Sequence, residues 1–98
     1  MSQGIYREVI MKDLESLRRE VDLIDTEISK LFSKRLDLVK DIKKEKTKRG
    51  LMISDIKREN EILTNLEDNT KSEYFPYSQE LFKDIIKISK DFQEQLNE

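Results

Sequence analysis

The fold class follows from residues 14–42, which read LESLRREVDLIDTEISKLFSKRLDLVKDI. The apolar residues of this stretch recur in steps of three and four, so they lie along one face of a long helix. They are Leu14, Leu17, Val21, Ile24, Ile28, Leu31, Leu38 and Ile42. No Gly or Pro interrupts the chain between Ile5 and Arg49, and Gly50 is a typical left-handed helix stop. We predict a first helix over residues 10–49.

Two shorter helices follow the first. The second is predicted over residues 55–68 with Ser54 as its N-cap, and the third from Pro76, because proline is favoured in the first helical turn. Their inner faces carry apolar residues at helical spacing. These faces comprise Met52, Ile56, Leu63 and Leu66 along the second segment, of which Met52 precedes the helix, and Phe82, Ile85, Ile86, Ser89, Phe92 and Leu96 in the third helix. The chain is therefore expected to be all-α, with one long helix and two shorter ones.

The length of the first helix raises the question of what covers its apolar stripe. A compact domain of this size has a radius of gyration of ~13 Å, whereas the first helix would extend for roughly 60 Å. Dimerisation through this helix is the simplest source of cover, so we expect an intertwined homodimeric helical bundle. Residues 1–98 are predicted to form a single domain, with residues 1–9 as a frayed N-terminal extension.

Composition excludes several classes of protein. The chain has 19 basic and 21 acidic residues and a net charge of −2, which gives no reason to expect binding to nucleic acid or to an anionic membrane. It contains no Cys and no His, which excludes a cysteine nucleophile, a Ser-His pair, the usual zinc sites and any disulfide. The N-terminus lacks an apolar run of signal-peptide length, so a cytoplasmic location is expected.

Two cations of the first helix stand on or near its apolar face. Arg35 falls in the middle of the stripe, where a buried guanidinium needs an anion. Lys46 lies eleven residues further on, so both side chains point the same way, about 16 Å apart along the axis. Together they could bracket a small dianion. Alternatively, Arg35 forms a buried salt bridge with Glu59 of the second helix, and Lys46 is a solvated lysine matched to the helix dipole.

The other two helices also carry polar groups on or beside their apolar faces. Asp55 and Glu59 are one turn apart in the second helix, with Arg58 adjacent. Gln93 lies one turn beyond Ser89 in the third helix. If the three helices converge, these groups form a compact pocket of cations, acids and an amide. Alternatively, Asp55 only caps its helix, Ser89 bonds to its own backbone and Gln93 faces water.

Over roughly residues 14–96, the ordered set of these residues resembles the all-helical chorismate mutase family. Each motif is weak by itself, but the family's spacings are matched across all three predicted helices. The matches are Leu-x-x-Leu-Arg followed by Asp (residues 14–18 and Asp25), an arginine ten residues later (Arg35), a lysine eleven further on (Lys46), Asp-x-x-Arg-Glu (residues 55–59) and Ser-x-x-x-Gln (residues 89–93).

The resemblance implies an enzyme that rearranges chorismate to prephenate in phenylalanine and tyrosine biosynthesis, with no cofactor and no metal. Lys46 and Gln93 would be its catalytic residues, donating hydrogen bonds to the ether oxygen whose bond breaks. Asp55 and Glu59 would meet the ring hydroxyl, with Glu59 as the stronger candidate. A fixed ammonium and amide beside an oxygen that gains negative charge stabilise the transition state more than the ground state.

The resemblance also implies how the two substrate carboxylates are bound. Arg18, Arg35 and Arg58 would bind them, with help from Ser89. Arg18 and Lys46 are 28 residues apart, or about 42 Å along one helix, so they cannot both touch one small ligand. If Arg18 is a site residue, it must be donated to the partner's site, as in the family's intertwined dimer.

Two other functions remain open at this point. An isochorismate pyruvate lyase of the same fold would share the arginines and the lysine, although Asp55 and Glu59 together look more like the mutase. A non-catalytic helical module, docked onto another enzyme of aromatic biosynthesis, is the third interpretation.

Overall fold

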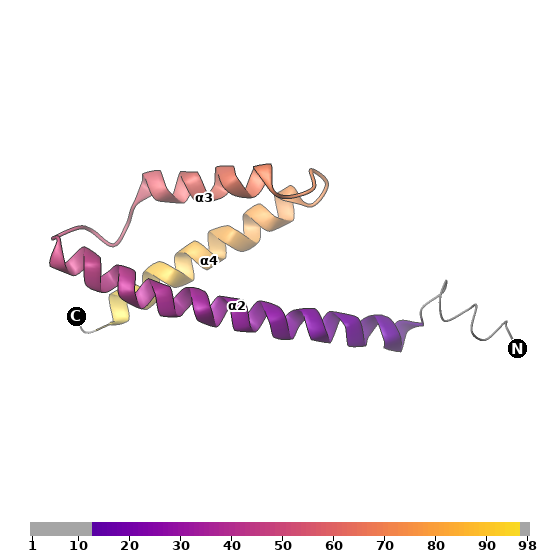
Figure 1. The fold of residues 1–98 in the computed structure, drawn as a ribbon. Helices are drawn as coiled ribbons and strands as arrows, with labels where there is room; N and C mark the ends of the chain where they lie inside the picture. Colours follow the sequence, from indigo (N-terminus) through magenta and orange to yellow (C-terminus); the bar gives the residue numbers. More distant parts are fainter. Residues whose placement is uncertain (1–12, 97–98) are drawn as a thin grey trace, which may run out of the picture. The chain divides into compact units, whose positions relative to one another are not determined.

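The computed structural model describes residues 13–96, and this part of the chain contains three α-helices and no strand (Figure 1). Helix α2 covers Leu14–Lys48, α3 covers Ile56–Asp68 and α4 covers Phe75–Gln95. The prediction of an all-α chain with one long and two shorter helices is confirmed. Residues 1–9 and the first residues of the predicted first helix lie outside the described part. None of the three helices is long and apolar enough to cross a membrane.

Helix α2 ends in the way that its sequence predicts. Gly50 adopts a left-handed conformation with φ of 68°. The Leu51 N–H donates to the Lys46 carbonyl at 2.8 Å, and the Gly50 N–H donates to the Thr47 carbonyl at 3.2 Å. This pair of bonds is the Schellman motif, which satisfies the last helical carbonyls and reverses the chain. The reversal directs the loop ahead of α3 back past the last turn of α2.

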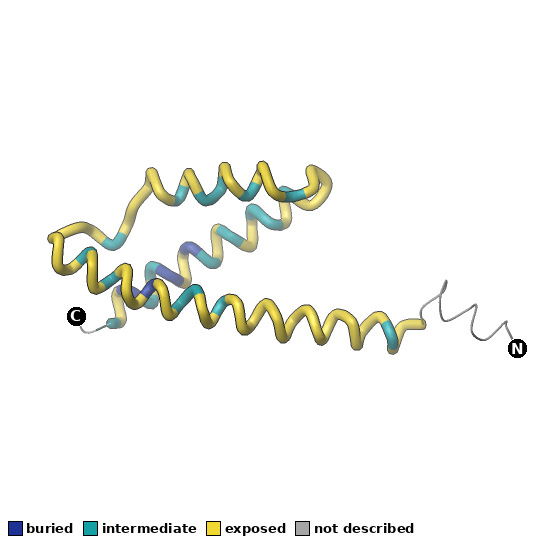
Figure 2. Tube along the Cα trace, in the orientation of Figure 1, coloured by how far each residue is buried: buried dark blue, intermediate teal, exposed yellow. Residues whose placement is uncertain are grey.

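The chain divides into two compact units, Met1–Arg35 and Leu36–Glu98. In the second unit, the covered side of α2 consists of four residues at helical spacing: Leu36, Val39, Lys43 and Lys46. Val39 is buried and the other three are half-buried. Figure 2 shows that most of α2 is exposed. The side of α2 that packs within the unit is therefore not the predicted apolar stripe, whose residues are between 45% and 64% exposed.

Helices α3 and α4 pack against each other within the second unit (Figure 1). The inner side of α4 contains the buried Ile86, Ser89 and Gln93. The covered side of α3 is half-buried and comprises Glu59, Ile62, Leu63 and Leu66. Two residues assigned to this side from sequence, Met52 and Ile56, are instead 79% and 64% exposed. That assignment is wrong because Met52 lies in the loop and Ile56 at the first helical residue, before the part of α3 that is covered.

Candidate active site

Lys46 is held in place by the loop that follows its helix. Its Nζ donates a hydrogen bond of 2.6 Å to the backbone carbonyl of Ile53, and the side chain is half-buried. The bond is possible because the Schellman turn at Gly50 brings the loop back past Lys46. The interpretation of Lys46 as a solvated lysine is therefore wrong: its ammonium has a defined position within the unit.

Ser89 and Gln93 lie one turn apart on the buried side of α4, and they are 6% and 5% exposed. The Ser89 hydroxyl donates to the Ile85 carbonyl at 2.7 Å, and the Gln93 Nε2 donates to the Ser89 carbonyl at 3.4 Å. Within residues 13–96, the buried Gln93 Oε1 has no hydrogen-bond partner. The alternative that Gln93 faces water is wrong, whereas Ser89 does bond to its own backbone.

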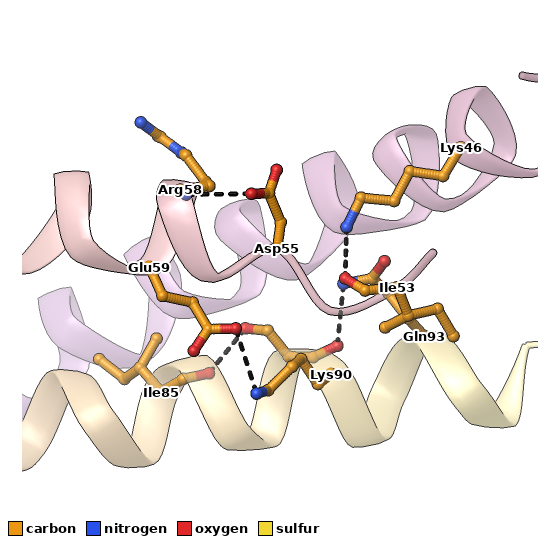
Figure 3. A network of polar contacts seen from close by, with 9 residues as sticks. Lys46, Ile53, Asp55, Arg58, Glu59, Ile85, Lys90 and Gln93 are labelled. Carbon is orange, nitrogen blue, oxygen red and sulfur yellow. Dashed lines mark hydrogen bonds and ion pairs between the residues drawn. The ribbon is translucent and has the colours of Figure 1, made fainter. Parts of the chain in front are cut away.

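The side chains of Lys46 and Gln93 point toward one another from α2 and α4 (Figure 3). An ammonium has three N–H donors and a carboxamide has two, and one donor of each is used in the bonds to Ile53 and Ser89. The Lys46 ammonium and the Gln93 carboxamide thus each have further N–H donors, and the two groups point toward one another. Such a pair can stabilise an oxygen that gains negative charge during a reaction.

Asp55 begins α3. Its backbone is extended, with φ of −138° and ψ of 90°, and its carboxylate accepts the Arg58 N–H at 3.1 Å. Asp55 is therefore the N-cap, and the assignment of this role to Ser54 is wrong by one residue. The two positions are both good caps by residue type. The backbone conformation at Asp55 decides between them.

Arg58 does not join the other candidate residues. Its guanidinium points outward, away from Glu59 (Figure 3), and lies 3.5 Å from Glu61 with the two side chains 66% and 53% exposed. An exposed pair of this kind contributes between zero and about 1 kcal/mol, so it restrains the arginine only weakly.

Glu59 points from α3 toward α4 and meets a residue that the sequence analysis did not single out. Its Oε2 lies 3.1 Å from Nζ of Lys90, and the two side chains are 22% and 33% exposed. A sequence signal for Lys90 does exist. It follows Ser89 directly and stands three residues before Gln93, so it flanks the inner side of α4.

Two further candidates, Arg18 and Arg35, belong to the other unit, Met1–Arg35. Arg18 is exposed and Arg35 is half-buried. The second unit by itself brings Lys46 and Gln93 together. It also contains Ser89, Asp55 and Glu59 near them.

The sequence model of one protein family, described as chorismate mutase type II, matches residues 17–94. The chain belongs to this family. The match spans most of the chain and includes every candidate residue from Arg18 to Gln93. Chorismate mutase is an isomerase that converts chorismate to prephenate. A search of curated proteins found no match.

Among residues 13–96, no three His, Cys, Asp or Glu side chains gather in a way that could hold a metal ion.

Proposed function

We propose that the chain catalyses the rearrangement of chorismate to prephenate as a cytoplasmic homodimer in phenylalanine and tyrosine biosynthesis, each chain forming one domain. The observation that carries this proposal is the pair of donors, Lys46 and the buried Gln93, that point toward one another from two helices. The family match supports the choice of substrate.

The reaction needs no leaving group. One ether C–O bond breaks and one C–C bond forms in a single pericyclic step, so every atom of the substrate stays in the product. Negative charge grows on the ether oxygen in the transition state, and Lys46 and Gln93 would donate hydrogen bonds to it. Because these donors are fixed before the reaction, stabilising the charge requires little reorganisation.

The substrate carboxylates require cations. We assign this role to Arg35, Arg58 and Arg18 of the partner subunit, with the Ser89 hydroxyl assisting. Arg58 would have to turn inward, and the weakness of its exposed contact with Glu61 makes this turn inexpensive. These groups would hold the enolpyruvyl arm over the ring. For a flexible substrate, the entropy lost in reaching this orientation is a large part of the activation barrier.

The ring hydroxyl requires an acceptor. We assign it to Glu59 and Asp55, with Glu59 as the principal one, because the Glu59 carboxylate lies on the covered side of α3 whereas Asp55 is exposed and accepts the Arg58 N–H. A carboxylate that is ionised can only accept hydrogen bonds, so it suits a hydroxyl donor.

The dimer is supported by the apolar stripe of α2, which remains exposed along its length in the single chain. Covering such a stripe contributes roughly 25 cal/mol per Å² of apolar surface removed from water. A two-fold symmetric contact between two copies of α2 would bury the same stripe on both chains. The dimer also explains how Arg18 could serve a site that contains Lys46, although the two residues are 28 positions apart in the sequence.

The direct test is to incubate the purified protein with chorismate and to follow the loss of its absorbance and the appearance of prephenate, with the mass in solution measured in parallel. We expect turnover by a dimer. A folded dimer that leaves chorismate unchanged would contradict the proposal. Incubation with isochorismate and an assay for pyruvate separates the mutase from a lyase. Activity that depends on a co-purifying pathway enzyme would favour the docked module.

A further inference from the structure

Helix α4 carries a cation that none of the family motifs uses. Lys90 Nζ lies 3.1 Å from Glu59 Oε2, and this contact joins α4 to α3 within the second unit (Figure 3). The pair is largely withdrawn from solvent, with side chains 33% and 22% exposed. By contrast, the Lys87–Asp91 pair on the same helix has side chains 73% and 52% exposed. Lys90 therefore interacts with Glu59 where water screens the charges much less.

The oxygen of Glu59 that meets Lys90 is itself buried and accepts no hydrogen bond within the described residues. The ammonium thus acts on it as a charge at close range. Two other charged groups of the site have contacts of their own: Lys46 Nζ donates to the Ile53 carbonyl, and the Asp55 carboxylate accepts the Arg58 N–H. Because a buried carboxylate oxygen without a compensating charge is costly, the Lys90 ammonium stabilises this orientation of the Glu59 carboxylate.

We propose that Lys90 is a positioning residue for substrate binding: it holds one oxygen of Glu59 against α4 and thereby presents the other oxygen to the ring hydroxyl. The inference rests on the proposed function, in which Glu59 accepts that hydroxyl. The terminal torsion of a glutamate is broad, so an unrestrained carboxylate samples many orientations. Fixing it in advance reduces the entropy that binding must remove.

The proposed role predicts a particular kinetic signature. A hydrogen bond to the ring hydroxyl exists both in the bound substrate and in the transition state, so weakening it raises KM and leaves kcat nearly unchanged. We expect Lys90→Met to raise KM about 10-fold, as for loss of one charge-assisted contact, while kcat changes less than about 3-fold. Lys90→Arg should restore KM because a guanidinium can also hold a carboxylate oxygen. A purely structural role would instead reduce the active fraction, which lowers kcat at constant KM.

Two controls isolate the Lys90–Glu59 contact. Lys87→Met removes the exposed ion pair on the same helix, and it should change neither constant. In a Glu59→Gln background, adding Lys90→Met should have no further effect on KM, because Lys90 acts through Glu59. If far-ultraviolet circular dichroism shows that the Lys90→Met variant is not folded, the Lys90→Gln variant replaces it, with the same expected rise in KM.

An unchanged KM in the folded Lys90 variant overturns the inference, and so does an equal rise in KM with and without the Glu59 carboxylate. These outcomes are distinct from failure of the proposed function. The latter appears as wild-type protein that does not convert chorismate at all.

Discussion

The ammonium of Lys46 donates a 2.6 Å hydrogen bond to the backbone carbonyl of Ile53, and this bond ties the last turn of α2 to the loop ahead of α3. The geometry depends on Gly50, whose left-handed conformation reverses the chain at the helix end. A lysine side chain loses considerable rotamer freedom when it is fixed. Because the bond to Ile53 already fixes the Lys46 side chain, a ligand that binds its ammonium causes little further loss of side-chain entropy.

The first prediction concerns Lys46. We expect Lys46→Ala to reduce kcat/KM for chorismate about 10²- to 10³-fold, the usual effect of removing one donor to a developing oxyanion. Arg35→Ala should be similarly damaging if Arg35 binds a substrate carboxylate. Far-ultraviolet circular dichroism should show that both variants keep their helicity. The matched control is Lys40→Ala, an exposed lysine of the same helix, which should keep wild-type kinetics. Near-normal rates in both site variants would refute the site assignment.

The second prediction concerns the chemistry of Gln93. An amide donates hydrogen bonds at every accessible pH, so the wild-type rate should not require acid. A carboxylic acid at this position donates only when it is protonated, and its ordinary pKa is about 4.3. We therefore expect Gln93→Glu to lose activity at neutral pH and to recover it as the pH falls toward about 5. Rates measured from neutral to acid pH test this, and a Gln93→Glu variant with a flat profile would argue against a donor role.

The third prediction tests whether Arg18 acts across the dimer. Arg18→Ala and Lys46→Ala chains should each be nearly inactive alone. In a mixed dimer, the site built on the Arg18→Ala chain keeps its own Lys46 and receives Arg18 of the partner subunit. Random mixing makes half of the dimers mixed with one intact site each, so about a quarter of wild-type activity should return. The assay is turnover after the two proteins are unfolded and refolded together. No recovery would mean that Arg18 does not act across the dimer.

The fourth prediction concerns the start of α2. The Asp13 carboxylate accepts the Ser16 N–H at 2.8 Å, and this bond, chiefly, lowers the pKa of Asp13 below 3.8. Because the folded pKa lies below the unfolded value, the bond contributes stability above pH ~4, and this contribution is lost as the pH falls through the folded pKa. Asp13→Ala should therefore lower Tm at neutral pH, and the difference from wild type should shrink in acid. A constant difference in Tm across this range would contradict the capping role.

Local patterns determined the helices of this chain. The three-and-four spacing from Leu14 to Ile42 and the glycine at position 50 predicted α2 to within one residue at its C-terminal end. These signals depend on residues within one or two turns of each other. Local signals placed the N-cap of α3 at Ser54, one residue before the observed Asp55, because both residue types suit the position.

The tertiary structure decided which side of α2 is covered within the chain and what Glu59 meets. Val39 and Lys46 face the interior, although the longer apolar stripe lies elsewhere on the same helix. Glu59 and Lys90 are 31 residues apart, and their contact exists only because α3 packs against α4. Helical periodicity specifies the direction of each side chain relative to its own axis. Which charges then meet depends on how separate helices pack, and no pattern local to one helix specifies that.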